Sequence, residues 1–320
     1  MSRFAFVFPG QGSQIVGMGR ALAESSPAAA AVFAEADKAL GEPISRLAWD
    51  GPAEMLDRTE NAQPALLATS IAYLAALRER WTADGAGGEP AFAAGHSMGQ
   101  YSALVAAGAL PLAVAIRLVR ERGVRMQASG ATRDGAMAAI LGLDDSQIPR
   151  LVEEASASGV FGVANRNAPG QVVVSGERAA IEAGAEIAKR LGARKAIVLP
   201  VSVAAHSPLM AAAAEGLRSV LAGVDFADPS PPLLANADAR PLTTGDECRA
   251  ELVEHLTAGV DWIAAIERMT AAGVTTFIEV GPGRVLTGLI KRIAPDADSI
   301  AVDDPNTADR LAIPALAAPA

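Results

Sequence analysis

The stretch "AFAAGHSMGQYSAL", residues 91–104, constrains the fold of this 320-residue chain more than any other segment. An apolar run ends at Gly95 and a helix-forming run begins at Gly99, so the chain must turn from a strand directly into a helix. In such a turn the residues two before and two after the centre approach each other closely, which explains a glycine at both places. The pattern Gly-x-Ser-x-Gly therefore predicts a strained elbow that exposes Ser97 at a helix N-terminus.

A serine in this position is a candidate nucleophile. The free N–H groups and the positive end of the helix dipole would face an anion that develops beside Ser97. The alternative is a chance match in a chain with 30 glycines. The strand before the motif and the helix after it favour the elbow.

A serine nucleophile needs a base, and the chain has three histidines. His96 adjoins Ser97 on the turn and is expected to pack against the elbow. His255 lies on an amphipathic helix, where it is either solvated or satisfied in the core. His206 follows the strand predicted over 194–203, in a loop beyond its end, where open α/β folds place catalytic groups. Elimination therefore favours His206 as the base. The alternative is that His206 is a loop histidine without a catalytic role. No third acid is evident, so a backbone carbonyl is expected to orient the imidazole.

Arg122 falls on the apolar side of a helix predicted from Pro111 to about Ser129. A guanidinium facing inward is unfavourable unless an anion meets it. Two interpretations stay open: a structural ion pair with a protein carboxylate, or a ligand carboxylate bound bidentately beside Ser97.

Strands and helices alternate along the chain, which predicts an α/β fold with a parallel sheet. Residues 136–200 follow the order βαββαβ, which is typical of a ferredoxin-like unit. We expect a large subdomain over 1–130 and 201–295, a small inserted subdomain over 131–200, and a loose tail over 296–320. A helix is expected to open with Pro64 in its first turn.

Composition limits the function classes. The formal net charge of −9 argues against nucleic acid or an anionic membrane as the main partner. One cysteine, Cys248, excludes a disulfide framework and favours a reducing compartment. Neither a signal peptide nor a membrane span is recognised, so we expect a cytoplasmic protein.

Seven blocks carry a resemblance to a known family, over about residues 3–295. They are "FVFPGQGSQ" (6–14), "TENAQPAL" (59–66), "GHSMGQYSAL" (95–104), "RERGVRMQ" (120–127), "NAPGQVVVSG" (167–176), "AHSPLM" (205–210) and "FIEVGPGRVLTGL" (277–289). In this order they resemble the malonyl-CoA:acyl carrier protein transacylases and the related acyltransferase domains of polyketide synthases. The resemblance implies a hydrolase-like large subdomain and a ferredoxin-like small one.

The resemblance also implies roles for individual residues. Ser97 would be the nucleophile, His206 the base and Arg122 the ligand of the malonyl carboxylate. The backbone N–H groups of Gln11 and Met98 would form the oxyanion hole. The other implied site residues are Gln63, Asn167, His96 and Ala205 around the substrate, and Asp261 as the carbonyl that orients the histidine.

Three positions depart from the family pattern. Gln100 replaces a usual glutamate that faces away from the chemistry, and Gly259 replaces a usual proline, which would loosen the loop of Asp261. Ala205 is smaller than the usual residue before the histidine and would relax the exclusion of a 2-methyl branch.

The resemblance implies transfer of a malonyl group from malonyl-CoA to the phosphopantetheine thiol of an acyl carrier protein, through a malonyl-serine ester. No metal or redox cofactor is expected, and a monomer is expected. The alternatives are a thioester hydrolase or a transacylase of broader acyl scope with the same serine and histidine. A docking module without catalysis would require a broken Ser97–His206 pair.

Overall fold

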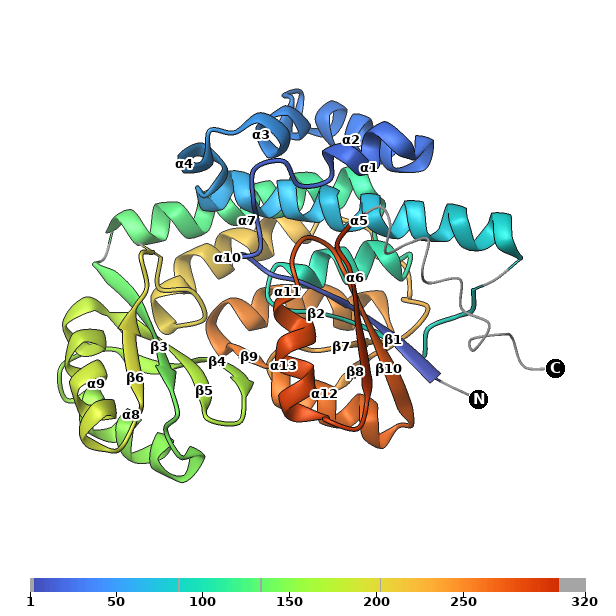
Figure 1. Cartoon of the computed structure of the whole chain (residues 1–320). Coiled ribbons are helices and arrows are strands. Elements are labelled where there is room, and N and C mark those ends of the chain that lie inside the picture. The colour runs from blue at the N-terminus through green and yellow to red at the C-terminus, as the bar shows by residue number, and fades with distance from the viewer. Residues whose placement is uncertain (1–2, 86, 133, 202, 305–320) are drawn as a thin grey trace.

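Two β-sheets lie side by side and carry helices on their faces (Figure 1). The computed structural model describes residues 3–85, 87–132, 134–201 and 203–304. The larger sheet has six strands in the order β11-β10-β1-β2-β7-β8, of which only β8 runs antiparallel to its neighbour. These strands are β1 (Arg3–Phe8), β2 (Phe92–Gly95), β7 (Leu233–Leu234), β8 (Pro241–Leu242), β10 (Val274–Val280) and β11 (Asp298–Val302).

The strand β1 shows why the larger sheet is covered on both faces. Side chains alternate between the two faces of a strand. Phe4, Phe6 and Phe8 belong to one apolar core, whereas Ala5 and Val7 belong to another. A continuous apolar run such as "FAFVF" is therefore buried completely, as expected for a central strand of a parallel sheet.

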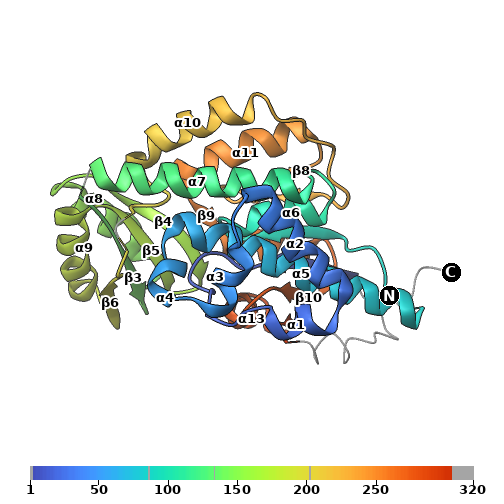
Figure 2. The ribbon, with the colours of Figure 1, turned by 90° about the horizontal axis from the view of Figure 1, so that it is seen from above.

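Helices from both halves of the chain form these cores. One face is covered by the first seven helices of the chain together with two later ones, α10 and α11, and the other face by α12 and α13 (Figures 1 and 2). These helices are α1 (Arg20–Ser25), α2 (Pro27–Leu40), α3 (Ile44–Asp50), α4 (Ala53–Leu56), α5 (Thr59–Asp84), α6 (Gly99–Ala106), α7 (Leu112–Thr132), α10 (Ala211–Leu221), α11 (Gly245–Ala258), α12 (Trp262–Ala271) and α13 (Val285–Ile293), with the 3₁₀ turn η2 (Pro208–Met210) before α10.

The smaller sheet has five strands in the order β6-β3-β5-β4-β9. Its first four strands are antiparallel, and α8 and α9 pack on one face, so the βαββαβ prediction is confirmed as a ferredoxin-like unit. The short strand β9 comes from the later part of the chain and adds in parallel to β4. The elements are β3 (Gly135–Leu141), η1 (Asp145–Gln147), α8 (Ile148–Ser156), β4 (Phe161–Ala168), β5 (Gln171–Glu177), α9 (Arg178–Arg190), β6 (Lys195–Val198) and β9 (Val260–Asp261).

Two predicted boundaries of single elements are wrong. The helix expected from Pro64 begins at Thr59, so the proline lies inside α5. Pro64 lacks the N–H that would bond to the carbonyl of Glu60, but extensive burial of α5 stabilises the helix through this position. The strand expected to reach residue 203 ends at Val198.

The predicted loose tail over 296–320 is wrong for its first part. Residues 298–302 form β11, which pairs in parallel with β10 at the edge of the larger sheet. Polar residues precede Ile300 and hide the strand in the sequence, whereas the exposed edge of β10 supplies its hydrogen-bonding partner. Residues 305–320 of the predicted tail lie outside the described residues. The subdomain boundaries at 130 and 200 stay predictions. Among the described helices, none combines the length and apolar character that a membrane crossing requires.

Candidate active site

The elbow between β2 and α6 places Ser97 as the sequence predicts. A Cβ atom on Gly95 would lie 1.9 Å from the carbonyl carbon of Gly99, and a Cβ on Gly99 would lie 2.3 Å from the carbonyl oxygen of Phe8. Both glycines are therefore required by close backbone contacts. Ser97 has φ 52°, a left-handed conformation that non-glycine residues rarely adopt.

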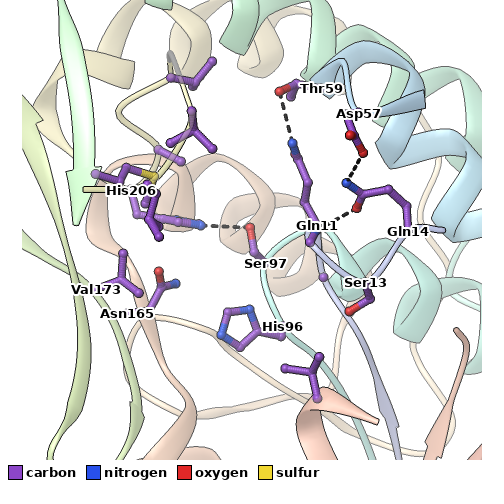
Figure 3. A pocket seen from close by; sticks show the side chains of 18 of the residues that line it. Gln11, Ser13, Gln14, Asp57, Thr59, His96, Ser97, Asn165, Val173 and His206 are labelled. Atoms are coloured by element: carbon purple, nitrogen blue, oxygen red, sulfur yellow. Dashed lines mark hydrogen bonds between the residues drawn. The ribbon is translucent and has the colours of Figure 1, made fainter. Parts of the chain in front are cut away.

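Ser97 and His206 point toward each other (Figure 3), and Ser97 Oγ lies 2.8 Å from His206 Nε2. His206 Nδ1 lies 2.5 Å from the carbonyl oxygen of His255, which can only accept a hydrogen bond. Nδ1 therefore carries the proton, and the bare Nε2 accepts the hydrogen bond from the Ser97 hydroxyl. This is the geometry of a nucleophile with its general base.

The prediction that Asp261 orients the histidine is wrong. The oxygen that holds His206 belongs to His255, near the C-terminal end of α11, where helix carbonyls lack intrahelical partners. The Asp261 side chain instead accepts a hydrogen bond from the N–H of Ala264 at 3.0 Å and caps α12. The sequence pattern did show that His255 lies on a helix, but only the packing of α11 brings its carbonyl to His206.

Burial and then the nearby charge of Arg122 lower the pKa of His206 to about 3. The imidazole is thus neutral near pH 7 and competent to take the Ser97 proton. His96 is only partly buried at the edge of the cavity, but desolvation still lowers its pKa below the ordinary histidine value.

The lowered pKa of His206 predicts the pH dependence of acylation. A base is lost as the pH falls through its pKa, so kcat/KM for formation of the acyl-serine should show no loss of this base between about pH 5 and 8. Arg122→Ala removes the positive charge that is the second cause of the shift, so the pKa of His206 should rise. The acid limb of the pH profile should then move to higher pH. Both pH profiles, of the wild type and of Arg122→Ala, should be measured with acetyl-CoA as donor, because the acetyl group has no carboxylate for Arg122 to bind. A wild-type limb near the ordinary histidine pKa would contradict this expectation.

Arg122 is almost completely buried, with 1% of its surface exposed. Its Nη1 donates to Gln63 Oε1 at 2.7 Å and its Nη2 to Ser97 Oγ at 3.1 Å. Nη2 also lies 3.4 Å from His255 Nε2, and the guanidinium carbon lies 6.0 Å from the centre of the Tyr101 ring. Within the described part of the chain no carboxylate pairs with Arg122. The interpretation as a structural ion pair therefore loses its support.

A cavity of about 740 Å³ lies between the two sheets, and three of the four remaining predicted substrate residues line it. His96, Asn167 and Ala205 line this cavity together with Arg122. His96 Nε2 lies 2.8 Å from Asn167 Oδ1, which links the elbow to β4. Gln63 does not line the cavity: it is fully buried behind Arg122, because the interior position of Gln63 on α5 faces α7. Its contact with substrate is therefore a wrong prediction.

The loop at Gln11 approaches the elbow from the end of β1. A Cβ atom on Gly10 would lie 2.6 Å from the carbonyl oxygen of His96, so only glycine allows this approach. Within the described residues, the N–H groups of Gln11 and Met98 donate to no protein acceptor. Two free donors beside a nucleophile fit the predicted oxyanion hole.

Two departures from the family pattern have structural reasons. Gln100 faces away from the cavity: its Oε1 accepts from the N–H of Gly95 at 3.2 Å and its Nε2 donates to the carbonyl of Leu234 at 3.0 Å. Gly259 has φ 97°, a conformation that proline cannot adopt. Its N–H lies 3.4 Å from the carbonyl oxygen of His255, so the glycine also contacts the group that orients the base.

Asn236 is a functional candidate that the sequence analysis missed. Its Oδ1 accepts from the N–H of Ser97 at 2.8 Å, and its Nδ2 donates to the carbonyl of Gly95 at 3.1 Å. Its own N–H donates to Glu251 Oε1 at 2.6 Å. The side chain thus holds both sides of the strained elbow and occupies the N–H of Ser97, which leaves Met98 as the donor for an oxyanion. The segment "LLANADA" carries no signal of this role.

Removal of the Asn236 amide should slow acylation. Asn236→Leu leaves the N–H of Ser97 and the carbonyl of Gly95 unpaired, so Ser97 loses its fixed position. A displacement of this kind lowers the rate of acylation by about 10²-fold. Rapid-quench intact-mass spectrometry of the acyl-serine measures this rate. Gln100→Leu is a matched control, since it removes a buried amide that also contacts Gly95 but does not contact Ser97. Equal acylation rates in the two variants would contradict the role of Asn236.

An α/β fold with a serine on a strand–helix elbow, hydrogen-bonded to a buried neutral histidine, defines the class of enzymes that form an acyl-serine ester. The chain belongs to the acyl transferase domain family, whose model matches residues 5–304.

Individual relatives are similar over nearly the whole chain. The malonyl CoA-acyl carrier protein transacylase of Bacillus subtilis is 46% identical over 317 residues, which cover 99% of this chain and 98% of that protein. The crystal structure of an acyl carrier protein S-malonyltransferase from Vibrio cholerae has a TM-score of 0.92 and 43% identity, covering 97% of this chain and 100% of the other. A malonyl-transacylase solved in complex with its type II PKS acyl-carrier protein has a TM-score of 0.90 and 42% identity, covering 96% and 98%.

Proposed function

We propose that this chain transfers a malonyl group from malonyl-CoA to the phosphopantetheine thiol of an acyl carrier protein. The observation that carries this proposal is Arg122. Its guanidinium is buried, has no carboxylate partner among the described residues, and lies 3.1 Å from Ser97 Oγ. A buried cation in that place fits an acyl group that ends in a carboxylate.

The first half-reaction acylates the serine. Ser97 Oγ attacks the thioester carbonyl of malonyl-CoA while His206 Nε2 takes the hydroxyl proton. The N–H groups of Gln11 and Met98 stabilise the oxyanion. The tetrahedral intermediate collapses, the C–S bond breaks, and the CoA thiolate leaves with the proton from His206.

The second half-reaction reverses these roles. The thiol of the carrier arm gives its proton to His206 and attacks the ester carbonyl of malonyl-Ser97. Collapse breaks the C–O bond, and the Ser97 oxygen recovers the proton. The product is the malonyl thioester of the carrier protein. We also propose that this chain needs no metal or redox cofactor for the transfer and that it acts as a monomer.

A thioester hydrolase with the same pair of residues is the alternative. Water would then replace the carrier thiol. Arg122 disfavours this alternative because it fixes the far end of the acyl group and fills space from which water would attack. The cytoplasm is the proposed location, since the one cysteine, Cys248, is buried as a free thiol.

The test of the proposal is Arg122→Ala. Loss of a charge-assisted bidentate pair, about 1.5–3 kcal/mol net, should lower the ratio of kcat/KM for malonyl-CoA over acetyl-CoA by about 10- to 150-fold. Acylation of Ser97 by each donor, followed by intact mass, measures this ratio. Arg117→Ala is the matched control, because Arg117 is exposed on the same helix.

A melting curve distinguishes a structural role of Arg122 from a role in binding the acyl carboxylate. If Arg122→Ala lowers the melting temperature and slows both donors equally, Arg122 is structural and the assignment of a carboxylate donor fails.

A further inference from the structure

His255 contacts the proposed base and the proposed carboxylate ligand through different atoms. Its main-chain carbonyl accepts the hydrogen bond from His206 Nδ1 at 2.5 Å. Its ring nitrogen Nε2 lies 3.4 Å from Arg122 Nη2. The side chain is completely buried, so these contacts are shielded from water.

The hydrogen-bond pattern fixes the protonation of the His255 ring. Nδ1 lies 2.9 Å from the carbonyl oxygen of Glu251, an acceptor, so Nδ1 carries the hydrogen. Nε2 then presents its lone pair to Arg122. Burial, then the charges of Arg122 and His206, lower the pKa of His255 well below its ordinary value, which agrees with a neutral ring.

All the polar groups that hold the Arg122 guanidinium are neutral acceptors. They are Gln63 Oε1, Ser97 Oγ and His255 Nε2. The nearest buried acid on α11, Glu251, has its pKa raised to about 8 by burial, so it too is mostly uncharged near pH 7. Neutral acceptors fix the direction of a guanidinium but leave its positive charge uncompensated, whereas a carboxylate would neutralise it and compete with a bound anion.

We propose that His255 is a positioning residue for acyl selectivity: its neutral ring holds Arg122 beside Ser97 and leaves the positive charge to the carboxylate of the acyl group. This inference rests on the proposed function, in which Arg122 binds that carboxylate. Because the contact with His206 comes from the main chain, it persists whatever side chain occupies position 255. Substitutions of the His255 side chain therefore change the contact with Arg122 but keep the main-chain hydrogen bond to His206.

The test compares His255→Gln with His255→Glu, two side chains of nearly equal size. The amide oxygen of glutamine is a neutral acceptor, so His255→Gln should keep the ratio of kcat/KM for malonyl-CoA over acetyl-CoA within about 3-fold of wild type. The carboxylate of glutamate would pair with Arg122, so His255→Glu should lower the ratio at least 10-fold. The loss should appear mainly as a higher KM for malonyl-CoA, with acetyl transfer much less affected.

A third variant, His255→Leu, removes the acceptor without adding charge. It should lower the same ratio by about 10-fold, because Arg122 loses one of its supports. Melting curves accompany all three proteins. Equal losses for malonyl and acetyl transfer in all variants, in proportion to a lower melting temperature, would mean a purely structural residue and would overturn the inference.

Arg122→Ala, measured in parallel, separates this inference from the proposed function. If Arg122→Ala leaves the malonyl-to-acetyl ratio unchanged, the proposed function of Arg122 fails and the inference fails with it. If Arg122→Ala lowers the ratio but His255→Glu does not, Arg122 keeps its role and only the inference about His255 is refuted. If His255→Leu fails to fold, the comparison of His255→Gln with His255→Glu still decides the outcome.

Discussion

Ser97→Ala should abolish covalent labelling by malonyl-CoA completely. The malonyl group has no other proposed attachment point, because Ser97 is the hydroxyl hydrogen-bonded to His206 Nε2 and placed beside Arg122. Incubation with malonyl-CoA followed by intact mass spectrometry measures the gain directly. The variant should still fold, since alanine is smaller than serine and the strained backbone of the elbow is held by Asn236.

Ser102→Ala is the matched control for this experiment. Ser102 lies on α6 a short distance after the elbow and is more deeply buried than Ser97, and its hydroxyl forms no hydrogen bond within the described residues. It should label like the wild type. A full mass gain in Ser97→Ala would refute the assignment of the nucleophile.

His206→Ala should slow acylation by about 10²- to 10⁴-fold, the usual contribution of a general base. Without the imidazole, no neutral nitrogen of the residues that the structure describes lies within hydrogen-bonding distance of Ser97 Oγ to take its proton. The neighbouring cation, Arg122, cannot accept a proton. Single-turnover acylation with malonyl-CoA measures the loss, and the ratio of malonyl to acetyl transfer should stay close to that of the wild type because Arg122 is intact.

His96→Ala provides the comparison for the base. Its ring also lines the cavity, but its Nε2 is engaged by Asn167 and not by Ser97. The variant should therefore lose far less activity than His206→Ala. If His96→Ala proved the slower of the two, the roles of the histidines would have to be exchanged.

Local sequence rules predicted much of this site because they describe local backbone geometry. The two glycines of the elbow predict the turn at Ser97, since the atoms that would clash with a side chain at Gly95 belong to Gly99, only four residues later. The period of α7 predicts that Arg122 faces inward, because a helix fixes which residues share a face. The alternation of strands and helices likewise predicts the ferredoxin-like unit between residues 135 and 198.

The groups that complete the site come from distant parts of the chain, and local rules do not reach them. The family resemblance implied Asp261 in place of His255, which lies six residues earlier, and the sequence of this segment contains no information on which carbonyl faces His206. Gln63 was placed against the substrate, although the packing of α5 against α7 puts it behind Arg122. Asn236 belongs to a segment whose sequence is unremarkable, and its role depends on β7 lying next to β2.

The sequence by itself therefore determined the class of fold, the elbow with Ser97, the inward direction of Arg122 and the choice of His206. The fold class, the elbow and the direction of Arg122 follow from steric and hydrophobic patterns within one or two elements, and His206 follows from elimination among three histidines. Only the tertiary structure decided which carbonyl orients the base, which amide clamps the elbow and which neutral groups hold Arg122. These contacts join residues 25 to 139 positions apart, and hydrogen-bond partners at such separations are chosen by the packing of whole helices and strands.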